Sequence, residues 1–354
     1  MVQNRRARPL LAQTRQRGWG RWIGFAGLLL IGACSVIGIP DSPLNALEPR
    51  GPIAERIDNL FWPVFWTATV IFVLVEGAVL AIIFLFRDRE GRKEPRQIHG
   101  NNRLEIVWTI IPTLILASIA VPTVRGVFDL TECASDAYPV QVIGHQWWFE
   151  YQYPDAGFST ANVMVIPAGQ EVCATMTSED VLHNFWVPSL NGKRYLVPGQ
   201  TTNLRLHADE PGVYWGQCAE FCGLSHSLMR AQVRAVTPPE FEEWLTAQSA
   251  PAATPEEGSP AAAGLEVFLQ RGCTQCHNVN PFNTTVTPEV FNGPDLTHFM
   301  DRGVIAGAYK EYSAENLQTW LANPPGEKPG SYMPNLGLTQ QEIDDLTAFL
   351  ETLR

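Results

Sequence analysis

Apolar residues gather in three runs before residue 125, and the rest of the chain has the mixed pattern of a globular protein. The first run, residues 23–32, follows an arginine-rich start and is too short to span a bilayer, as in a signal peptide. The second, residues 61–86, would be about 39 Å long as a helix, enough to cross a membrane with some tilt. The third, residues 106–121, reaches spanning length with its flanking residues. We expect a signal peptide over residues 1–33 and a transmembrane hairpin region over residues 34–130.

The segment between the two spanning runs is basic. Residues 87–103 contain the cationic side chains of Arg87, Arg89, Arg92, Lys93, Arg96 and Arg103. Because positively charged loops stay in the cytoplasm, both ends of the hairpin and the chain after it are expected on the outer face of the cell membrane. Glu76 lies inside the first span, where a charge is costly. A protonated structural carboxyl and a functional group both remain open for it.

From residue 139 to about residue 236 the pattern changes to short alternating runs separated by Gly and Pro. Examples are residues 140–143, 171–175, 202–206 and 232–236. About a hundred residues of short strands predict an all-β sandwich of the Greek-key kind, which we place at residues 131–247. Cys133 and Cys173 are left over in this exported domain. They can pair as a disulfide, but their spacing does not decide it.

Residues 248–263 are rich in Ala, Pro and Glu and predict a linker of low complexity. A third domain follows over residues 264–354, with helical patterns at 264–271, 314–322 and 339–353. It opens with Cys273-Thr-Gln-Cys276-His277, the spacing of c-type haem attachment. Two thiols at this spacing can bond to the vinyl groups of a haem, and the adjacent histidine can bind its iron. A redox dithiol followed by an incidental histidine is the alternative.

The densest cluster of candidate ligands runs from Cys218 to Met229 and reads Cys-x-Glu-x-Cys-x-x-x-His-x-x-Met. Upstream, His183 supplies a second imidazole. Soft sulfur ligands beside imidazole suit copper, or zinc. A structural zinc site usually has Cys-x-x-Cys pairs and does not recruit a Met. The alternative is a buried cysteine pair, or a disulfide, in a β domain.

This pattern resembles the binuclear copper (CuA) centre of cytochrome c oxidase subunit II, from Asp180 through Gly216-Gln-Cys to Met229. The copper ligands that the resemblance implies are His183, Cys218, Glu220, Cys222, His226 and Met229. The two cysteines would bridge two copper ions, each histidine would bind one of them, and the methionine would be a weak ligand. Glu220 would bind copper through its backbone carbonyl and a magnesium ion, at the interface with subunit I, through its carboxylate. An exposed Glu held by the loop is the alternative.

The resemblance extends over essentially the whole mature chain. It implies a cupredoxin-like fold for the β domain and an all-α class I cytochrome c fold for residues 264–354. Gly293-Pro-Asp-Leu296 resembles a turn that packs on the haem. Met333 lies in the loop before the last helix, the position of the axial ligand that raises the reduction potential. Met300 lies in an expected helix and is assigned to the core.

Three further positions have roles only through this resemblance. Trp147, in an aromatic run, is the candidate for electron entry to copper, and a packed aromatic cluster is the alternative. Glu105 has the position of a proton-channel entrance into subunit I, and an ion pair with Arg103 is the alternative. The residues that end in Cys34 resemble a bacterial lipobox, which implies acylation of that thiol. Plain signal cleavage nearby and an uncleaved anchor with an incidental cysteine are its alternatives.

The formal net charge is −11, although the first 33 residues carry six arginines and no acidic residue. Such an acidic protein repels nucleic acid and attracts cationic partners, which fits a basic soluble electron donor. The sequence holds no Ser-His-Asp arrangement, P-loop or nucleotide fingerprint. It also lacks haem-binding histidines in a multi-span region, so the chain is not expected to reduce oxygen by itself.

We therefore expect a multi-domain membrane protein that resembles subunit II of a caa3-type cytochrome c oxidase with a fused cytochrome c. Electrons would pass from a soluble cytochrome c or a quinol:cytochrome c reductase to the haem, the copper and then subunit I, where oxygen is reduced and protons are pumped. Subunit III would be a further partner. There are two competing hypotheses. One is the electron-entry subunit of a copper-containing nitric oxide reductase, and the other is a membrane-anchored electron-transfer or copper-delivery protein that acts without a catalytic partner. A quinol oxidase subunit is disfavoured, because such relatives lack the copper ligands.

Overall fold

The computed structural model describes residues 42–87, 91, 97–283 and 293–354. The predicted signal peptide over residues 1–33, the candidate lipidation site Cys34 and most of the basic loop lie outside the described residues. Residues from Pro43 to Arg354 form one compact unit. Within it, a helical hairpin, a β domain (residues 138–248) and a C-terminal domain (residues 260–354) follow one another along the chain.

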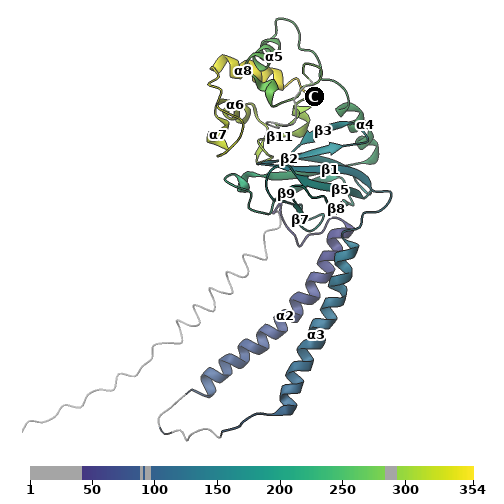
Figure 1. The fold of residues 1–354 in the computed structure, drawn as a ribbon, viewed down its shortest axis with the longest axis vertical. Helices are drawn as coiled ribbons and strands as arrows, with labels where there is room; N and C mark the ends of the chain where they lie inside the picture. Colours follow the sequence, from purple (N-terminus) through teal and green to yellow (C-terminus); the bar gives the residue numbers. More distant parts are fainter. Residues whose placement is uncertain (1–41, 88–90, 92–96, 284–292) are drawn as a thin grey trace, which may run out of the picture. The chain divides into compact units, whose positions relative to one another are not determined.

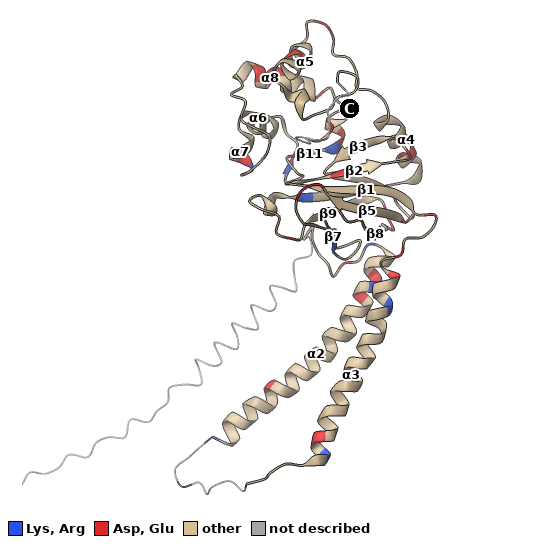
Figure 2. Cartoon of the chain, in the orientation of Figure 1, with Lys and Arg blue, Asp and Glu red and all other residues tan. Residues whose placement is uncertain are grey.

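The hairpin consists of α2 (Pro52–Leu85) and α3 (Asn102–Asp129). Both helices are long and apolar enough to cross a membrane. In Figure 2 both helices are tan over most of their length, and most of their charged residues lie near their ends. The side chain of Asn101 caps α3 by accepting from the backbone N–H groups of Arg103 and Leu104. Each helix is longer than the apolar run that predicted it, because turns with polar residues extend α2 before its run and α3 on both sides of its run.

The β domain lies beyond the ends of α2 and α3 in the chain and is labelled from β1 to β9 in Figure 1. It contains two five-stranded sheets, in the orders β3-β2-β1-β5-β8 and β4-β10-β9-β6-β7. Its strands are β1 (Tyr138–His145), β2 (Trp148–Tyr153), β3 (Phe158–Ala161), β4 (Val163–Pro167), β5 (Val172–Ser178), β6 (His183–Trp186), β7 (Arg194–Leu196), β8 (Thr202–Leu206), β9 (Gly212–Cys218) and β10 (Arg230–Val236). The pairs β1–β5 and β4–β10 are parallel, and the other pairs are antiparallel. Buried and half-buried residues alternate along β5, as a strand with one face on the core requires. The predicted β sandwich is confirmed.

The β-domain core is rich in aromatic side chains. Phe149, Tyr151, Tyr153 and Phe185 are fully buried. The Tyr153 hydroxyl donates to the Val165 carbonyl and accepts from the Val165 N–H, both at 2.8 Å. Its polar end is thus satisfied inside the core, which removes the penalty of burying it.

A disulfide joins Cys133, just after α3, to Cys173 in β5, and so answers a question that the spacing left open. Beside it, the Glu171 carboxylate pairs with Arg205 at 2.6 Å and accepts from the Ala134 N–H at 2.9 Å. Arg205 also donates to the carbonyl of Asp129, the last residue of α3. A covalent bond and an ion pair therefore anchor the end of the hairpin to the β domain.

Helix α4 (Pro238–Gln248) follows β10 and ends the β domain. The C-terminal domain contains α5 (Pro260–Gln270), β11 (Val304–Ile305), β12 (Lys310–Glu311), α6 (Ala314–Ala322), α7 (Pro324–Glu327) and α8 (Gln340–Leu350). Its core is built around Phe268, Leu346 and Phe349. Helix α6 has the predicted bounds, and α8 starts one residue later than expected because Thr339 is its N-cap.

The start of α5 differs from the expectation. The helix was expected from residue 264, but it begins at Pro260, inside the predicted linker. The Ser259 hydroxyl accepts from the Ala262 N–H at 3.1 Å, and Pro260 occupies the first helical position, where its missing N–H costs nothing. A Ser-Pro start inside an Ala-rich stretch is a helix signal that the low-complexity composition concealed.

Candidate metal centres

The candidate copper ligands lie at the meeting point of three strands. His183 begins β6 and Cys218 ends β9. The loop after β9 carries Cys222, and Met229 lies directly before β10. The backbone N–H of Cys218 donates to the Met229 carbonyl at 3.0 Å, which joins the two ends of this loop next to the β9–β10 pair.

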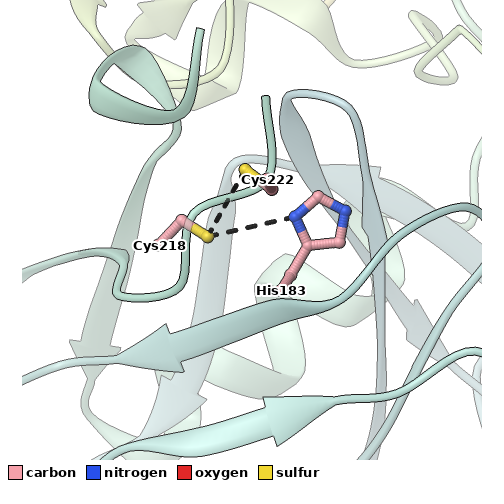
Figure 3. A group of neighbouring side chains, drawn as sticks. All are labelled: His183, Cys218 and Cys222. Atoms are coloured by element: carbon pink, nitrogen blue, oxygen red, sulfur yellow. Dashed lines mark hydrogen bonds between the residues drawn. The ribbon is translucent and has the colours of Figure 1, made fainter. Parts of the chain in front are cut away.

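The ligating atoms converge (Figure 3). The two thiols lie 3.8 Å apart, and His183 Nδ1 lies 3.9 Å from Cys218 Sγ. His226 Nδ1 lies 3.5 Å from Cys222 Sγ, and Met229 Sδ lies 3.9 Å from the same sulfur. A disulfide needs about 2.0 Å between its sulfurs, so these two cysteines are free thiols facing each other. The alternative of a disulfide at this position is therefore wrong.

Asp180 orients His183. Its Oδ1 lies 2.8 Å from His183 Nε2, which leaves Nδ1 directed at the sulfur of Cys218. Burial raises the pKa of Asp180, but the hydrogen bonds from His183 and from backbone N–H groups outweigh it and keep that pKa below its usual value. Histidines oriented by a carboxylate are typical of metal sites, because the bond from one ring nitrogen to the carboxylate fixes the ring and leaves the other nitrogen for the metal.

The two thiols compete for one proton. Hydrogen bonding from Cys222, together with His183, lowers the pKa of Cys218 to about 4, while the neighbouring thiolate raises the pKa of Cys222. Cys218, Cys222 and His183 are buried, so a charge here lacks water to stabilise it. A cation that binds both sulfurs would replace the shared proton and satisfy the buried thiolates.

Glu220 has two separate polar groups at this site. Its backbone carbonyl lies 3.3 Å from Cys218 Sγ and accepts from that thiol. Hydrogen bonding to its carboxylate raises the pKa of Tyr195, an exposed residue of β7. The carbonyl therefore faces the buried sulfurs, whereas the carboxylate lies with an exposed side chain.

Trp147 is in direct contact with the ligand loop. Its indole Nε1 donates to the Cys222 carbonyl at 3.0 Å, and Gln146 Nε2 donates to the same carbonyl at 2.6 Å. The indole is only 6% exposed, so it is a packed residue as well as a neighbour of the candidate ligands.

A cavity of about 810 Å³ adjoins the attachment motif in the C-terminal domain. Its lining includes Cys273, Cys276, His277 and Met333. Met300, the competing methionine, packs against the same hydrophobic core as Met333 but is not among the residues that line the cavity.

The proximal wall of this cavity is tightly fitted. His277 Nδ1 lies 2.8 Å from the Pro294 carbonyl, which fixes the ring and leaves Nε2 for a ligand. A Cβ on Gly293 would lie 2.6 Å from the His277 ring, so only glycine fits there. The predicted turn at residues 293–296 therefore packs on the histidine.

Arg302 is a buried group that sequence reasoning missed. It is 5% exposed, lines the same cavity and donates to the Asp295 carbonyl. Its Nε has no hydrogen-bond partner among the residues that the structure describes. Burial lowers the pKa of Arg302 to about 10. An unpaired guanidinium N–H in a cavity fits an anionic group of a bound molecule, such as a haem propionate. Nothing local in the sequence distinguishes this arginine from a surface one.

The remaining predicted positions lie apart from these centres. Glu105 is exposed in the first turn of α3, and Glu76 is exposed in the middle of α2.

Comparison with known protein families divides the chain in the same way. Residues 44–125 match the transmembrane domain of cytochrome c oxidase subunit II, and residues 156–236 match its periplasmic domain. Residues 261–354 match cytochrome c. The periplasmic domain of this family implies a binuclear copper centre, and the cytochrome c domain implies a haem.

Two relatives show how far the similarity extends along the chain. "Cytochrome c oxidase subunit 2" of Alkalihalophilus pseudofirmus is 37% identical over 345 residues, which cover 94% of this chain and 96% of the relative. "Quinol oxidase subunit 2" of Bacillus cereus is 32% identical over 242 residues, which cover 65% of this chain and 80% of that one.

A solved periplasmic domain of subunit II of cytochrome oxidase from Bradyrhizobium japonicum is 27% identical. It covers 34% of this chain and 96% of its own, with a TM-score of 0.32. Family membership rests on the sequence matches, which extend over nearly the whole chain. The chain belongs to the cytochrome c oxidase subunit II family and carries a cytochrome c domain at its C-terminal end.

Proposed function

We propose that this chain is the electron-entry subunit of a caa3-type haem-copper terminal oxidase. It passes electrons from a c-type haem through a binuclear copper centre to subunit I, which reduces oxygen to water and pumps protons. The observation that carries this proposal is the convergence of two free thiols, two imidazoles and a thioether in one buried site. Membership of the family implies subunit I as a partner.

In the copper site, Cys218 and Cys222 would bridge the two metals, and His183 and His226 would each bind one. Met229 and the Glu220 carbonyl would complete the set. Such a centre stores and releases one electron at a time. The residues around it hold the ligands still: Asp180 fixes one imidazole, and Trp147 and Gln146 fix the carbonyl of Cys222. A rigid ligand set limits the rearrangement that accompanies a change of charge.

In the haem site, Cys273 and Cys276 would form the covalent bonds, and His277 and Met333 would be the axial ligands. A haem with His and Met ligands supplies one-electron chemistry at a raised potential. The Pro294 carbonyl orients the proximal imidazole, and Arg302 offers a buried positive charge to a propionate.

Several finer assignments belong to the same proposal. The outer face of the cell membrane carries the β domain and the C-terminal domain, which the segment at residues 249–259 connects. The leader at residues 1–33 directs export, with lipidation at Cys34. Glu220 offers its carboxylate to magnesium at the subunit I interface, and Glu105 lies at the entrance of a proton channel. Trp147 is the residue through which electrons reach copper. Subunit III is a further partner, and a soluble cytochrome c or a quinol:cytochrome c reductase is the donor.

Metal and optical analysis of the purified full chain, produced with copper and haem-attachment machinery, tests the metal centres. We expect two coppers and one covalent haem per chain, with an EPR signal of one electron shared by two copper nuclei. A single zinc, or haem without copper, would contradict the copper assignment.

Gas consumption by the intact complex then tests the reaction. Oxygen uptake with reduced cytochrome c supports the oxidase. Nitric oxide uptake without oxygen uptake would favour the nitric oxide reductase, and a chain isolated without subunit I would favour a copper-delivery role.

A further inference from the structure

The β domain and the C-terminal domain are joined by a first group of hydrogen bonds near α4. Arg234 donates to the carbonyls of Asp301 and Arg302 at 3.0 and 3.1 Å. Gln248, at the end of α4, donates to the Asp301 carboxylate at 2.8 Å and is itself buried. These bonds leave the candidate copper loop untouched, so they hold the two domains together without involving it.

A second group of bonds lies beside the candidate copper loop. The Arg230 N–H donates to the Gly307 carbonyl at 2.9 Å, and the buried Ser225 hydroxyl donates to the Pro329 carbonyl at 2.6 Å. Both donors lie next to candidate copper ligands in the sequence. The C-terminal domain therefore contacts the loop that holds those ligands.

Lys328 lies in the centre of this second contact. It is 4% exposed, and its Nζ donates to the Trp147 carbonyl of the β domain at 2.6 Å. The same ammonium donates to the Ala306 carbonyl of its own domain at 2.8 Å and lies 6.0 Å from the centre of the Tyr309 ring. Burial lowers the pKa of Lys328 to about 7. Burying a lysine is costly unless its ammonium is hydrogen-bonded. The two carbonyl partners of Lys328 come from different domains, so its bonds stabilise the contact between those domains.

The backbone around Lys328 is shaped for close approach. A Cβ on Gly330 would lie 2.6 Å from the Trp147 ring, and a Cβ on Gly307 would lie 2.6 Å from the Trp147 carbonyl. Ala306 and Ala308 have positive φ angles of 53° and 58°, which non-glycine residues adopt at a cost. This unfavourable turn directs the Ala306 carbonyl at Lys328 and the Gly307 carbonyl at Arg230.

The same loop brings an aromatic side chain onto Trp147. The Tyr332 ring is nearly parallel to the indole, with ring centres 6.5 Å apart, and its hydroxyl donates to Gln146 Oε1 at 3.0 Å. Tyr332 directly precedes the candidate axial ligand Met333, and Trp147 bonds to the carbonyl of Cys222. Covalent bonds and side-chain contacts thus connect the two candidate metal sites.

We propose that Lys328 is a positioning residue that docks the C-terminal domain on the β domain with Tyr332 over Trp147. This inference rests on the proposed function for its electron-transfer consequence. Without the Lys328 bridge, the loop would lose its bond to the Trp147 carbonyl and the two aromatic rings would separate. In the docked arrangement, the chain's own haem domain occupies the surface over Trp147. An external donor therefore delivers electrons to the haem domain and not directly to Trp147.

The test uses the intact oxidase complex with the substitutions Lys328→Met and Gly330→Ala. Photoinjection of one electron into the haem measures the rate of its transfer to copper. We expect both substitutions to slow this step about tenfold or more, because small displacements of reacting groups are costly. Hydrogen exchange of the Arg230 amide, which donates across the contact, should become about tenfold faster or more as the docked state opens.

Each substitution has a matched control. Lys310→Met removes a lysine of the same domain whose partners, Glu327 and Tyr309, belong to that domain. Gly337→Ala places a Cβ at a positive φ of 60° in the same loop, with open space around it. Both controls should keep the rate and the exchange of the unsubstituted protein. Haem potential and the iron–sulfur charge-transfer band should stay unchanged in all four proteins.

Unchanged transfer rate and unchanged exchange in Lys328→Met would overturn the proposal. So would faster exchange with an unchanged transfer rate, because docking would then not position the electron path. If Lys328→Met alters the charge-transfer band, the comparison of Gly330→Ala with Gly337→Ala tests the proposal in its place. The transfer rate and the exchange of the Arg230 amide are again measured, and equal values for these two variants would overturn the proposal. Absence of haem or copper from the unsubstituted protein would overturn the proposed function, whereas the Arg230 amide would still report whether Lys328 docks the domains.

Discussion

His183 presents Nδ1 to Cys218 because Asp180 holds the opposite ring nitrogen. The ring of a histidine without such a partner can rotate, and rotation would turn its ligating nitrogen away from a bound metal. Loss of an outer carboxylate of this type commonly lowers metal affinity by about 10–100-fold.

Asp180→Asn should therefore weaken copper binding by about 10–100-fold while leaving the thiols in place. Competition with a copper chelator measures the affinity directly. Asp209→Asn is the matched control, because Asp209 pairs with His207 at 3.5 Å elsewhere in the β domain. Equal affinities for the two variants would contradict the orienting role.

The two methionines of the C-terminal domain have different surroundings. Both pack against the hydrophobic core of the domain, but Met333 also lines the cavity with His277, and Met300 is not among the residues that line it. Met333→Ala should abolish the iron–sulfur charge-transfer band and lower the haem potential by on the order of 0.1 V, part of the ~0.8 V range that axial ligands span. Met300→Leu should leave both unchanged in a spectroelectrochemical titration. The reverse result would move the axial ligand to Met300.

At the scale of elements, the end of α3 is held on the β domain by the Cys133–Cys173 disulfide and by the Glu171–Arg205 pair. Burial raises the pKa of Glu171, but its bonds to Arg205 and to the Ala134 N–H outweigh this and lower it overall. A carboxylate with a lowered pKa stabilises the fold above its unfolded pKa of about 4.3. That contribution is lost as the pH falls through the lower, folded value.

Glu171→Gln should lower the free energy of unfolding by about 1 kcal/mol at pH 7, a modest value because the pair is only partly buried. The difference from the unsubstituted chain should shrink below about pH 4, where the carboxylate becomes protonated in both states. Thermal unfolding in detergent at pH 7 and at pH 3 measures it. Glu210→Gln, at an exposed position, is the control. A difference that grows toward low pH would contradict the ion-pair explanation.

At the scale of the whole molecule, the C-terminal domain covers Trp147, and hydrogen bonds hold the segment between the two domains. The Ala252 N–H, in the predicted linker, donates to the Asn280 carbonyl at 2.7 Å, and the Ala250 carbonyl lies 2.9 Å from His298 Nε2. These bonds hold the segment against the C-terminal domain, a contact that its low-complexity composition does not reveal. Tethering raises the local concentration of the donor, and docking also fixes its orientation.

Mixing the oxidised complex with a reduced external cytochrome should therefore reduce the haem before the copper. Stopped-flow spectroscopy at the separate haem and copper absorption bands measures the order. Reduction of the haem should slow as salt is added, because salt screens the attraction between this chain, with its net charge of −11, and the basic donor that we expect. Copper reduction that precedes haem reduction would show that an external donor reaches Trp147 directly.

The order of the domains and the nature of each could be predicted from the sequence. Apolar runs predicted the two helices, alternating runs predicted the sandwich, and the fold class is confirmed. The candidate ligands from Cys218 to Met229 could be named because they lie on one short loop, where spacing controls which atoms can meet. The start of α5 was misplaced because an Ala-rich stretch has both the composition of a linker and a high helix propensity.

The sequence by itself determined the membrane hairpin, the two metal-binding motifs and the kinds of metal that suit them, because these are local properties of periodicity, spacing and ligand chemistry. Only the tertiary structure decided the rest. Cys133 meets Cys173 across 40 residues, and Lys328 meets the Trp147 carbonyl across 181. Arg302 is buried in a cavity that no neighbour in the sequence reveals. Such contacts depend on which surfaces pack together, since burial and partner geometry arise only when distant segments are folded side by side.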